Sequence, residues 1–251
     1  MSMGNDGTAT RRILILGGTG EARALAALLV ERGHTVTSSL AGRTRQPERP
    51  IGSVRIGGFG GAAGLAAYLD AYRIEVLIDA THPFAAQISA NAAQAARAVG
   101  VTLIRIERPQ WKRPEGAQWI EVDDMDAAAK VLPGGANVLL TIGRQELAPF
   151  MGRADCRFVA RMIEVPEGVP ERWRVVAERG PFALETERAL MQAEAITHLV
   201  SKHAGGEQTA AKIEAAAQLG IPVVMVRRPL LPPALVAHSV ADVVLMIDGV
   251  G

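Results

Sequence analysis

The chain has 251 residues, 49% of them hydrophobic, and a formal net charge of +1. This length allows one large or two small domains with a sizeable core, and the near-zero charge argues against a general nucleic-acid binder. A single cysteine, Cys156, excludes a disulfide framework, and no Cys/His pattern has metal-ligand spacing. The polar residues 1–10 are expected to form a flexible tail, and without a long apolar run the chain is expected to be cytoplasmic, with no membrane partner.

The first expected strand, 13–16, runs into a turn in which three glycines lie within residues 17–20. A helix-period segment, 21–32, follows without a gap. Strand, glycine turn and helix in this order present backbone N–H groups and a helix N-terminus to a pyrophosphate. The strict G-x-G-x-x-G spacing is not met, because Arg23 stands at the third glycine position. An ordinary βα turn is therefore the alternative to the phosphate-binding turn that the sequence favours.

The second expected strand, 34–38, ends in a segment, 38–45, that contains hydroxyls and arginines but no Asp or Glu. NAD sites place an acidic residue here for the ribose 2′-hydroxyl, whereas NADP sites accept a phosphate. The segment thus predicts NADP(H), and a solvated loop is the alternative for Arg43 and Arg45.

Two later segments also follow expected strands. Glycines within 57–61 precede a helix over 62–72, which predicts either a second backbone approach to the cofactor or a flexible turn. Strand 74–79 runs into the loop 80–84 at the carboxyl end of a presumed central strand, where ligands bind in open α/β sheets.

The sequence then repeats itself. Residues 74–109 can be laid over 196–229, because both contain a strand, a His-containing loop, an Ala-rich helix, a glycine, an apolar strand and Arg-Pro. Segment 119–122 likewise matches 237–240, each expected to be a short strand before a terminal helix. Alternating strands and helices predict parallel sheets, and the repeat predicts two of them.

We expect the domain boundary at the Pro- and Gly-containing segment 132–135. This gives a first, NADP-binding domain over 11–132 and a second, substrate-binding domain over 133–251. Segment 137–144 mirrors the first strand and turn with one glycine in place of three.

Cations follow the expected strands of the second half, and they are Arg144, Arg179, Lys202 and, on the next helix, Lys212. A cluster of Arg and Lys at this rim suits a substrate with several carboxylates. The alternative is that these cations pair with neighbouring glutamates, such as Glu146, Glu178 or Glu207.

Seven segments, in this order, together resemble the precorrin-6A reductase family of cobalamin biosynthesis. They are Gly17–Arg23, Ser38–Arg43, Gly57–Gly61, Asp79–Ala85, Thr141–Arg144, Arg179–Phe182 and Ser201–Gly206. The resemblance covers about residues 11–248, and His203 departs from it where Asn is expected. It implies two Rossmann-like α/β domains that exchange a strand, with NADPH on the first domain and a polycarboxylate tetrapyrrole in the cleft between them. The match of 119–122 with 237–240 is the expected place of the exchange.

The resemblance and the motifs together give the expected contacts. Cofactor contacts are Gly17, Gly18, Thr19, Gly20, Glu21, Ala22, Ser38, Ser39, Ala41, Gly42, Arg43, Gly58, Phe59, Thr81, His82 and Pro83. Substrate contacts are Arg144, Arg179, Gly180, Lys202, His203, Gly205, Gly206 and Lys212.

The reaction implied is hydride transfer from NADPH to the conjugated macrocycle, with protonation of the adjacent carbon. The Tyr-x-x-x-Lys pair of short-chain reductases is absent, since Tyr68 and Tyr72 are the only tyrosines. His82 is the one candidate catalytic side chain, and a structural hydrogen bond that orients its loop is the equal alternative. Glu21 can cap its helix instead of contacting ligand. The competing functions are an NADP-binding sensor and a short-chain-type reductase for another polycarboxylate.

Overall fold

The computed structural model describes residues 9–42, 50–163, 165 and 167–249. The chain divides into two compact units, the first made of Met1–Arg108 and Leu230–Gly251 and the second of Pro109–Pro229. Most of the tail expected at 1–10 lies outside the described residues. Among the helices of the described residues, none is long and apolar enough to cross a membrane.

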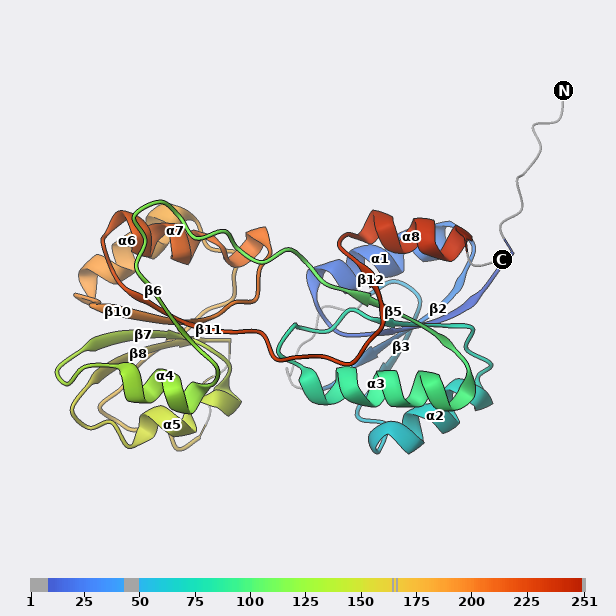
Figure 1. Ribbon diagram of the computed structural model, residues 1–251, viewed down its shortest axis with the longest axis horizontal. Coiled ribbons are helices and arrows are strands. Elements are labelled where there is room, and N and C mark those ends of the chain that lie inside the picture. Colours follow the sequence, from blue (N-terminus) through green and yellow to red (C-terminus); the bar gives the residue numbers. More distant parts are fainter. Residues whose placement is uncertain (1–8, 43–49, 164, 166, 250–251) are drawn as a thin grey trace, which may run out of the picture. The chain divides into compact units, whose positions relative to one another are not determined.

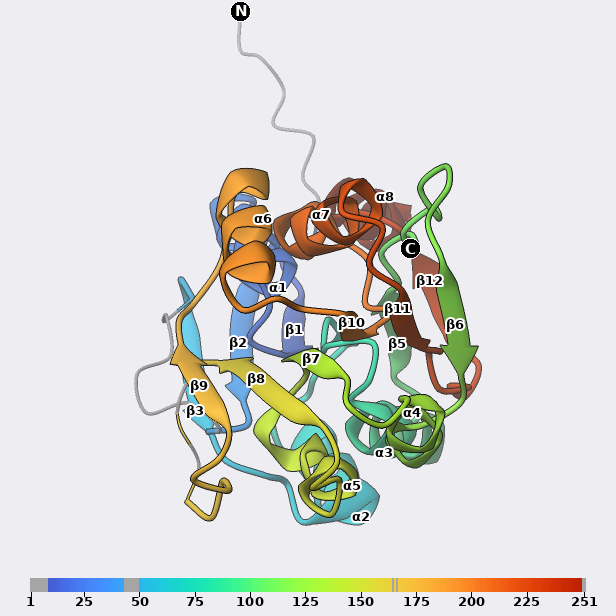
Figure 2. The same cartoon turned by 90° about the vertical axis from the view of Figure 1, so that its left-hand side faces the viewer.

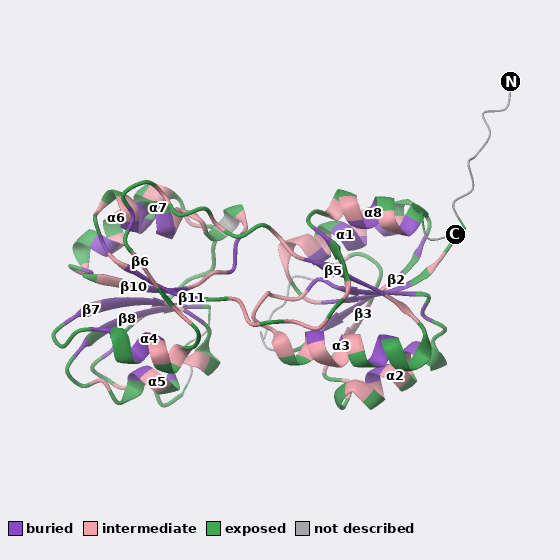
Figure 3. Ribbon diagram, viewed as in Figure 1, coloured by how far each residue is buried: buried purple, intermediate pink, exposed green. Residues whose placement is uncertain are grey.

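A six-stranded parallel sheet forms the centre of the first unit, in the order β12-β5-β4-β1-β2-β3 (Figure 1). Its strands are β1 (Arg12–Leu16), β2 (Thr35–Leu40), β3 (Ser53–Ile56), β4 (Val76–Asp79), β5 (Thr102–Ile106) and β12 (Leu235–Ala237). Helices α1 (Gly20–Glu31) and α8 (Val240–Gly249) cover one face, and α2 (Gly61–Ala71) and α3 (Ala86–Val99) cover the other. Helices on both faces bury the central strands, which explains their continuous apolar runs (Figure 3).

The second unit is built the same way, with a parallel sheet in the order β6-β11-β10-β7-β8-β9 (Figure 2). Its strands are β6 (Trp119–Val122), β7 (Asn137–Thr141), β8 (Arg157–Met162), β9 (Arg174–Ala177), β10 (His198–Lys202) and β11 (Val223–Val226). Helices α6 (Leu184–Ala193) and α7 (Ala211–Gln218) lie on one face, and α4 (Met125–Val131) and α5 (Ala148–Met151) lie on the other. Two short 3-10 turns, η1 (Arg144–Glu146) and η2 (Glu207–Thr209), follow β7 and β10.

Numbered along the chain, the first sheet has the strand order 3-2-1-4-5-6, and the second sheet has the same arrangement for β7 to β11, with β6, the first strand of its unit, in the last place. This is the order of the dinucleotide-binding Rossmann fold, so the predicted fold class is confirmed. The order reverses between β1 and β4 in the first sheet and between β7 and β10 in the second. Ligands of such sheets bind at this switch point, outside the carboxyl ends of the strands.

The predicted strand exchange is also present. Strand β6 pairs with β11 of the second sheet, with Trp119 opposite Val223, and β12 pairs with β5 of the first, with Leu235 opposite Ile104. The boundary expected at 132–135 is therefore corrected, because the units divide the chain at 108/109 and 229/230. The Pro-Gly segment is a turn inside the second unit, between α4 and β7.

The second exchanged strand lies earlier than the predicted range 237–240. β12 ends at Ala237 because the next residues form the cap of α8. Asp242 Oδ2 accepts the N–H groups of His238 at 2.9 Å and Ser239 at 3.0 Å, and Ser239 Oγ accepts the N–H of Asp242 at 3.1 Å. Such reciprocal capping satisfies the first N–H groups of a helix and sets its start.

A buried ion pair ties the C-terminal segment to the first sheet. Arg105 Nε on β5 donates to Asp79 Oδ2 at the end of β4 over 3.2 Å, and the two side chains are 4% and 1% exposed. Arg105 Nη1 also donates to the carbonyl oxygen of Pro232, which precedes β12, over 2.8 Å. One guanidinium thus joins β4, β5 and the chain segment that returns from the second unit.

We expect Arg105→Met to lower the free energy of unfolding by about 3–5 kcal/mol, because it leaves the Asp79 carboxylate buried without its cation. Urea unfolding measures the change. The double variant Asp79→Asn/Arg105→Met keeps an acceptor for Thr81 and removes the charge, so it should regain part of the loss. A double variant less stable than Arg105→Met would contradict this explanation.

Candidate functional site

The glycine turn lies directly against the end of β4. Gly17 has a φ of +127°, and a Cβ at this position would overlap the carbonyl oxygen of Ala80. Thr19 fixes the same contact from the other side, because its Oγ1 donates to the Ala80 oxygen at 3.0 Å and accepts the Ala22 N–H at 3.1 Å as the N-cap of α1. Only glycine allows this approach of two backbones, which places the start of α1 at the switch point of the first sheet.

The acidic residue at the start of α1 is neutralised. Glu21 Oε1 accepts from Arg108 Nη1 over 3.0 Å, and Arg23 Nη1 donates to the Gly18 carbonyl oxygen over 2.9 Å. A free carboxylate here would repel a pyrophosphate, whereas the Arg108 guanidinium cancels its charge. The side-chain cap of α1 is Thr19, whereas Glu21 pairs with Arg108.

The two serines at the end of β2 are buried beside the glycine turn. The carbonyl oxygen of Ser39 accepts the N–H of Gly17 over 3.1 Å. Within the described part of the chain, the buried Ser38 Oγ has no hydrogen-bond partner. The strand continues two residues beyond the expected end at Ser38, and Ala41 and Gly42 follow it, while the predicted contact Arg43 lies outside the described residues.

Arg55 is a residue of this site that the sequence reasoning missed. Its Nη1 donates to Ser39 Oγ at 3.0 Å and to the Gly57 carbonyl oxygen at 2.9 Å, and its Nη2 donates to the Gly58 carbonyl oxygen at 3.0 Å. The guanidinium lies 3.7 Å from the centre of the Phe59 ring. Arg55 therefore joins the end of β2 to the glycine segment after β3, and an arginine one residue before the end of a strand was the signal available in the sequence.

The loop after β4 is held by the carboxylate of Asp79. Its Oδ1 accepts the Thr81 hydroxyl at 2.6 Å and the Thr81 N–H at 3.2 Å. His82 Nδ1 accepts the N–H of Phe84 at 3.3 Å, so a neutral His82 ring carries its proton on Nε2. Of the two roles predicted for His82, this contact is the structural one that orients the loop.

The corresponding turn of the second sheet is filled by a side chain of the protein. Glu146 Oε2 accepts the N–H of Gly143 at 2.8 Å and the Lys202 ammonium at 2.8 Å. A carboxylate therefore occupies the turn that follows β7, at the switch point where the first sheet presents its glycine turn. The turn after β7 is thus unsuited to a phosphate, and Lys202 makes the glutamate pairing that the sequence left as an alternative.

The loop after β10 packs on Trp111, a residue that the sequence analysis did not predict to be part of the site. Trp111 Nε1 donates to the Gly206 carbonyl oxygen over 2.7 Å, and its own carbonyl oxygen lies 3.0 Å from His203 Nε2. A Cβ at Gly205 would overlap the Pro109 carbonyl oxygen. The structure thus brings His203, Gly205 and Gly206 together on the segment that leads to β6.

The remaining predicted substrate contacts differ in their surroundings. Arg144, Arg179 and Gly180 are exposed at the ends of β7 and β9. Lys212 is buried, with Nζ 5.4 Å from the centre of the Trp111 ring. Burial, followed by the nearby charge of Arg161, lowers the pKa of Lys212 from 10.5 to about 8.

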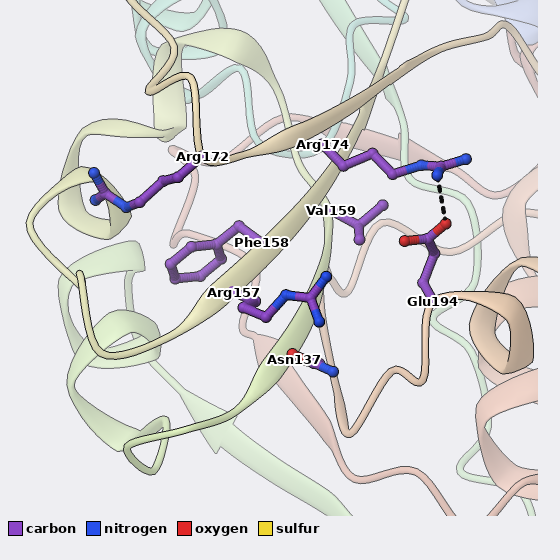
Figure 4. Close-up of a pocket in the computed structure, with 7 residues that line it drawn as sticks. All are labelled: Asn137, Arg157, Phe158, Val159, Arg172, Arg174 and Glu194. Carbon is purple, nitrogen blue, oxygen red and sulfur yellow. Dashed lines mark ion pairs between the residues drawn. The ribbon is translucent and has the colours of Figure 1, made fainter.

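A small pocket of about 140 Å³ lies at the opposite end of the second sheet (Figure 4). It is lined by Asn137, Arg157, Phe158, Val159, Arg172, Arg174 and Glu194. Three of these residues begin β7, β8 and β9, so the pocket is at the amino ends of the strands. It is therefore separate from the carboxyl rim that carries the predicted contacts.

Comparison with known proteins gives one consistent result. The family model described as precorrin-6x reductase CbiJ/CobK matches residues 12–248. A precorrin-6A reductase of Rhodococcus erythropolis is 50% identical over 243 residues, which cover 96% of this chain and 97% of the relative. A cobalt-precorrin-6A reductase of Priestia megaterium is 29% identical over 254 residues, with 92% and 96% covered.

A solved structure of the precorrin-6A reductase CobK superimposes with a TM-score of 0.90 at 41% identity, covering 96% of this chain and 97% of that chain. Both matches cover nearly the whole length of the two chains compared, so they include both sheets of this chain. The chain belongs to the precorrin-6x reductase family.

Proposed function

We propose that this protein reduces precorrin-6A to precorrin-6B with NADPH, in the biosynthesis of the corrin ring. Relatives named precorrin-6A reductase are 44–50% identical to it, whereas those named for the cobalt form are 29–31% identical. This difference favours the metal-free macrocycle as substrate. The observation that carries the proposal is the glycine turn held against Ala80 at the switch point of the first sheet.

The residues at this switch point fit a dinucleotide. The absence of a Cβ at Gly17 lets the turn pass close to Ala80, and Gly18 before α1 and Gly20 at its first position add no side chain between the backbone and a pyrophosphate. The α1 N-terminus adds a partial positive charge, and Arg108 neutralises the only carboxylate in its first turn. In our proposal these groups hold the pyrophosphate of the cofactor.

The end of β2 fits a 2′-phosphate better than a 2′-hydroxyl. Residues 38–45 contain no Asp or Glu. Ser38 Oγ has no hydrogen-bond partner in the described structure, and the Arg55 guanidinium donates a hydrogen bond to Ser39 Oγ. Arginines bind phosphate through paired, charge-assisted hydrogen bonds. We assign the phosphate to the two serines, Arg55 and Arg43.

NADPH bound in this way would supply a hydride to the conjugated system of the macrocycle. The Thr81–Pro83 loop, which His82 orients by accepting the N–H of Phe84, would then line the nicotinamide end. A conjugated iminium-like system accepts hydride without prior protonation, so positioning and electrostatics provide most of the catalysis. Arg144 and Arg179 on the second unit bind carboxylates of the macrocycle.

The direct test is anaerobic incubation of the purified protein with precorrin-6A and either NADPH or NADH. We expect NADPH consumption together with a change in the visible spectrum of the macrocycle, and much slower turnover with NADH. Binding of NADPH without oxidation or spectral change would contradict the reductase proposal and favour the NADP-sensing alternative.

We expect Gly17→Ala to raise the Kd for NADPH at least tenfold, since the methyl group forces the turn away from Ala80 and the φ of +127° is unfavourable for alanine. Fluorescence titration measures the affinity, and thermal unfolding checks the fold. Gly152→Ala is the matched control, because its added methyl group meets no neighbouring atom and its φ is −76°. Equal affinities of the two variants for NADPH would refute the placement of the pyrophosphate.

Removal of Arg55 should discriminate between the two cofactors. Arg55→Met keeps an apolar contact with Phe59 but loses the charge, so NADPH should bind about 10–100-fold more weakly while NADH affinity stays within about threefold. Arg43→Ala should act in the same direction. Arg97→Met, on the exposed last turn of α3, serves as the control. Equal losses for NADPH and NADH would mean that Arg55 only orders the glycine segment.

A further inference from the structure

The second unit contains a cluster of five charged side chains near the carboxyl ends of its strands. We call it the charge cluster, and its members are Glu146, Arg161, Glu187, Lys202 and Lys212. They come from η1, β8, α6, β10 and α7. With all groups ionised, three cations face two carboxylates, so the charge cluster has one positive charge in excess.

Both carboxylates of the charge cluster already form ion pairs with other cations. Arg161 Nη1 and Nη2 donate to the two Glu187 oxygens at 2.8 and 2.7 Å, with side chains only 6% and 1% exposed. Lys202 Nζ donates to both oxygens of Glu146, at 3.0 and 2.8 Å. The Arg161 guanidinium also lies 3.8 Å from the centre of the Phe182 ring, which completes its packing.

Lys212 is the third cation and has no carboxylate of its own. It is 7% exposed, and among the described residues no acidic oxygen lies within ion-pair distance of its Nζ. Its Nζ lies 5.4 Å from the centre of the Trp111 ring. Burial lowers its pKa most, Arg161 and Lys202 also lower it, and Glu187 opposes them, so that the pKa is about 8. Keeping this amine buried costs stability, which a methionine of similar length would not.

The position of Lys212 places this buried amine near the predicted substrate contacts of the second unit. It is the second residue of α7, which follows β10 and the loop that packs on Trp111. Its side chain is therefore on the same rim as the predicted substrate contacts, and the N-terminus of α7 adds a partial positive charge there. An anion delivered to this rim would meet a cation that the protein itself leaves uncompensated.

We propose that Lys212 receives one carboxylate of the macrocycle and takes up a proton from solvent as it does so. The inference rests on the proposed function, since it takes the substrate from it. No covalent bond changes, because the neutral amine becomes an ammonium ion that pairs with the incoming carboxylate. An adjacent anion favours the charged amine, so above about pH 8 binding and proton uptake are linked.

The test is the pH dependence of KM for precorrin-6A between pH 7 and 9.5 at saturating NADPH. In the unaltered protein we expect KM to rise about tenfold across this range with little change in kcat, because the macrocycle carboxylates stay ionised throughout. Lys212→Met should show a high KM already at pH 7 and no rise with pH. Titration of the macrocycle by its visible spectrum, without NADPH, gives the same comparison independently of turnover.

Thermal unfolding adds a readout that does not involve substrate. The lowered pKa means that the folded protein binds fewer protons than the unfolded chain between about pH 8 and 10.5. The stability lost by burying the charged Lys212 is therefore largest below pH 8 and decreases as the pH rises. Lys212→Met should therefore have a higher Tm than the unaltered protein at pH 7, with a smaller difference at pH 9.5. Lys130→Met, on the exposed end of α4, should change neither Tm nor KM.

Two outcomes would overturn the proposal. A KM that rises with pH in Lys212→Met as in the unaltered protein would assign the linkage to another group. A lower kcat at unchanged KM would mean that Lys212 acts in proton delivery and not in carboxylate binding. Turnover of precorrin-6A by the unaltered protein separates both outcomes from failure of the proposed function itself.

Discussion

The close approach of Gly17 to Ala80 is the constraint on which the proposed cofactor site depends. Two parallel strands at the switch point can end this near each other only because one of the facing residues lacks a Cβ. Thr19 then uses one hydroxyl to cap α1 and to hold the end of β4. Through Asp79 and Arg105 the same loop is joined to β5 and to the segment before β12, so the site and the exchanged strand stabilise each other.

The second unit has the same arrangement of strands, with β6 in the place of β12, but different chemistry at the equivalent switch point. After β7 the N–H of Gly143 is taken by Glu146, which also binds Lys202. A turn whose N–H already donates to a carboxylate has no free donor there for a phosphate, and the negative charge of the carboxylate repels a phosphate. The cations that surround it, with Lys212 lacking a carboxylate partner among the described residues, suit carboxylates of a ligand instead. In our proposal, one fold therefore provides two kinds of anion site through a few changes in the strand-end turns.

Local patterns in the sequence predicted the features that depend on local chemistry. The glycine turn and the two parallel sheets could be predicted in this way, whereas the strand exchange was implied by the family resemblance and located by the internal repeat. The domain boundary could not, because a Pro-Gly turn inside a unit looks the same in sequence as a linker between units. Arg55, Trp111 and the Arg161–Glu187 pair were missed for a related reason, since their partners lie on other strands and helices.

Hydrogen exchange followed by mass spectrometry, with and without NADPH, tests most directly which of the two equivalent switch points holds the cofactor. We predict slower exchange in peptides that contain the turn of residues 17–20 and the loop of residues 80–84, with no change around Gly143 and Glu146. Protection at the turn after β7, without protection at the turn after β1, would contradict the division of roles between the two units.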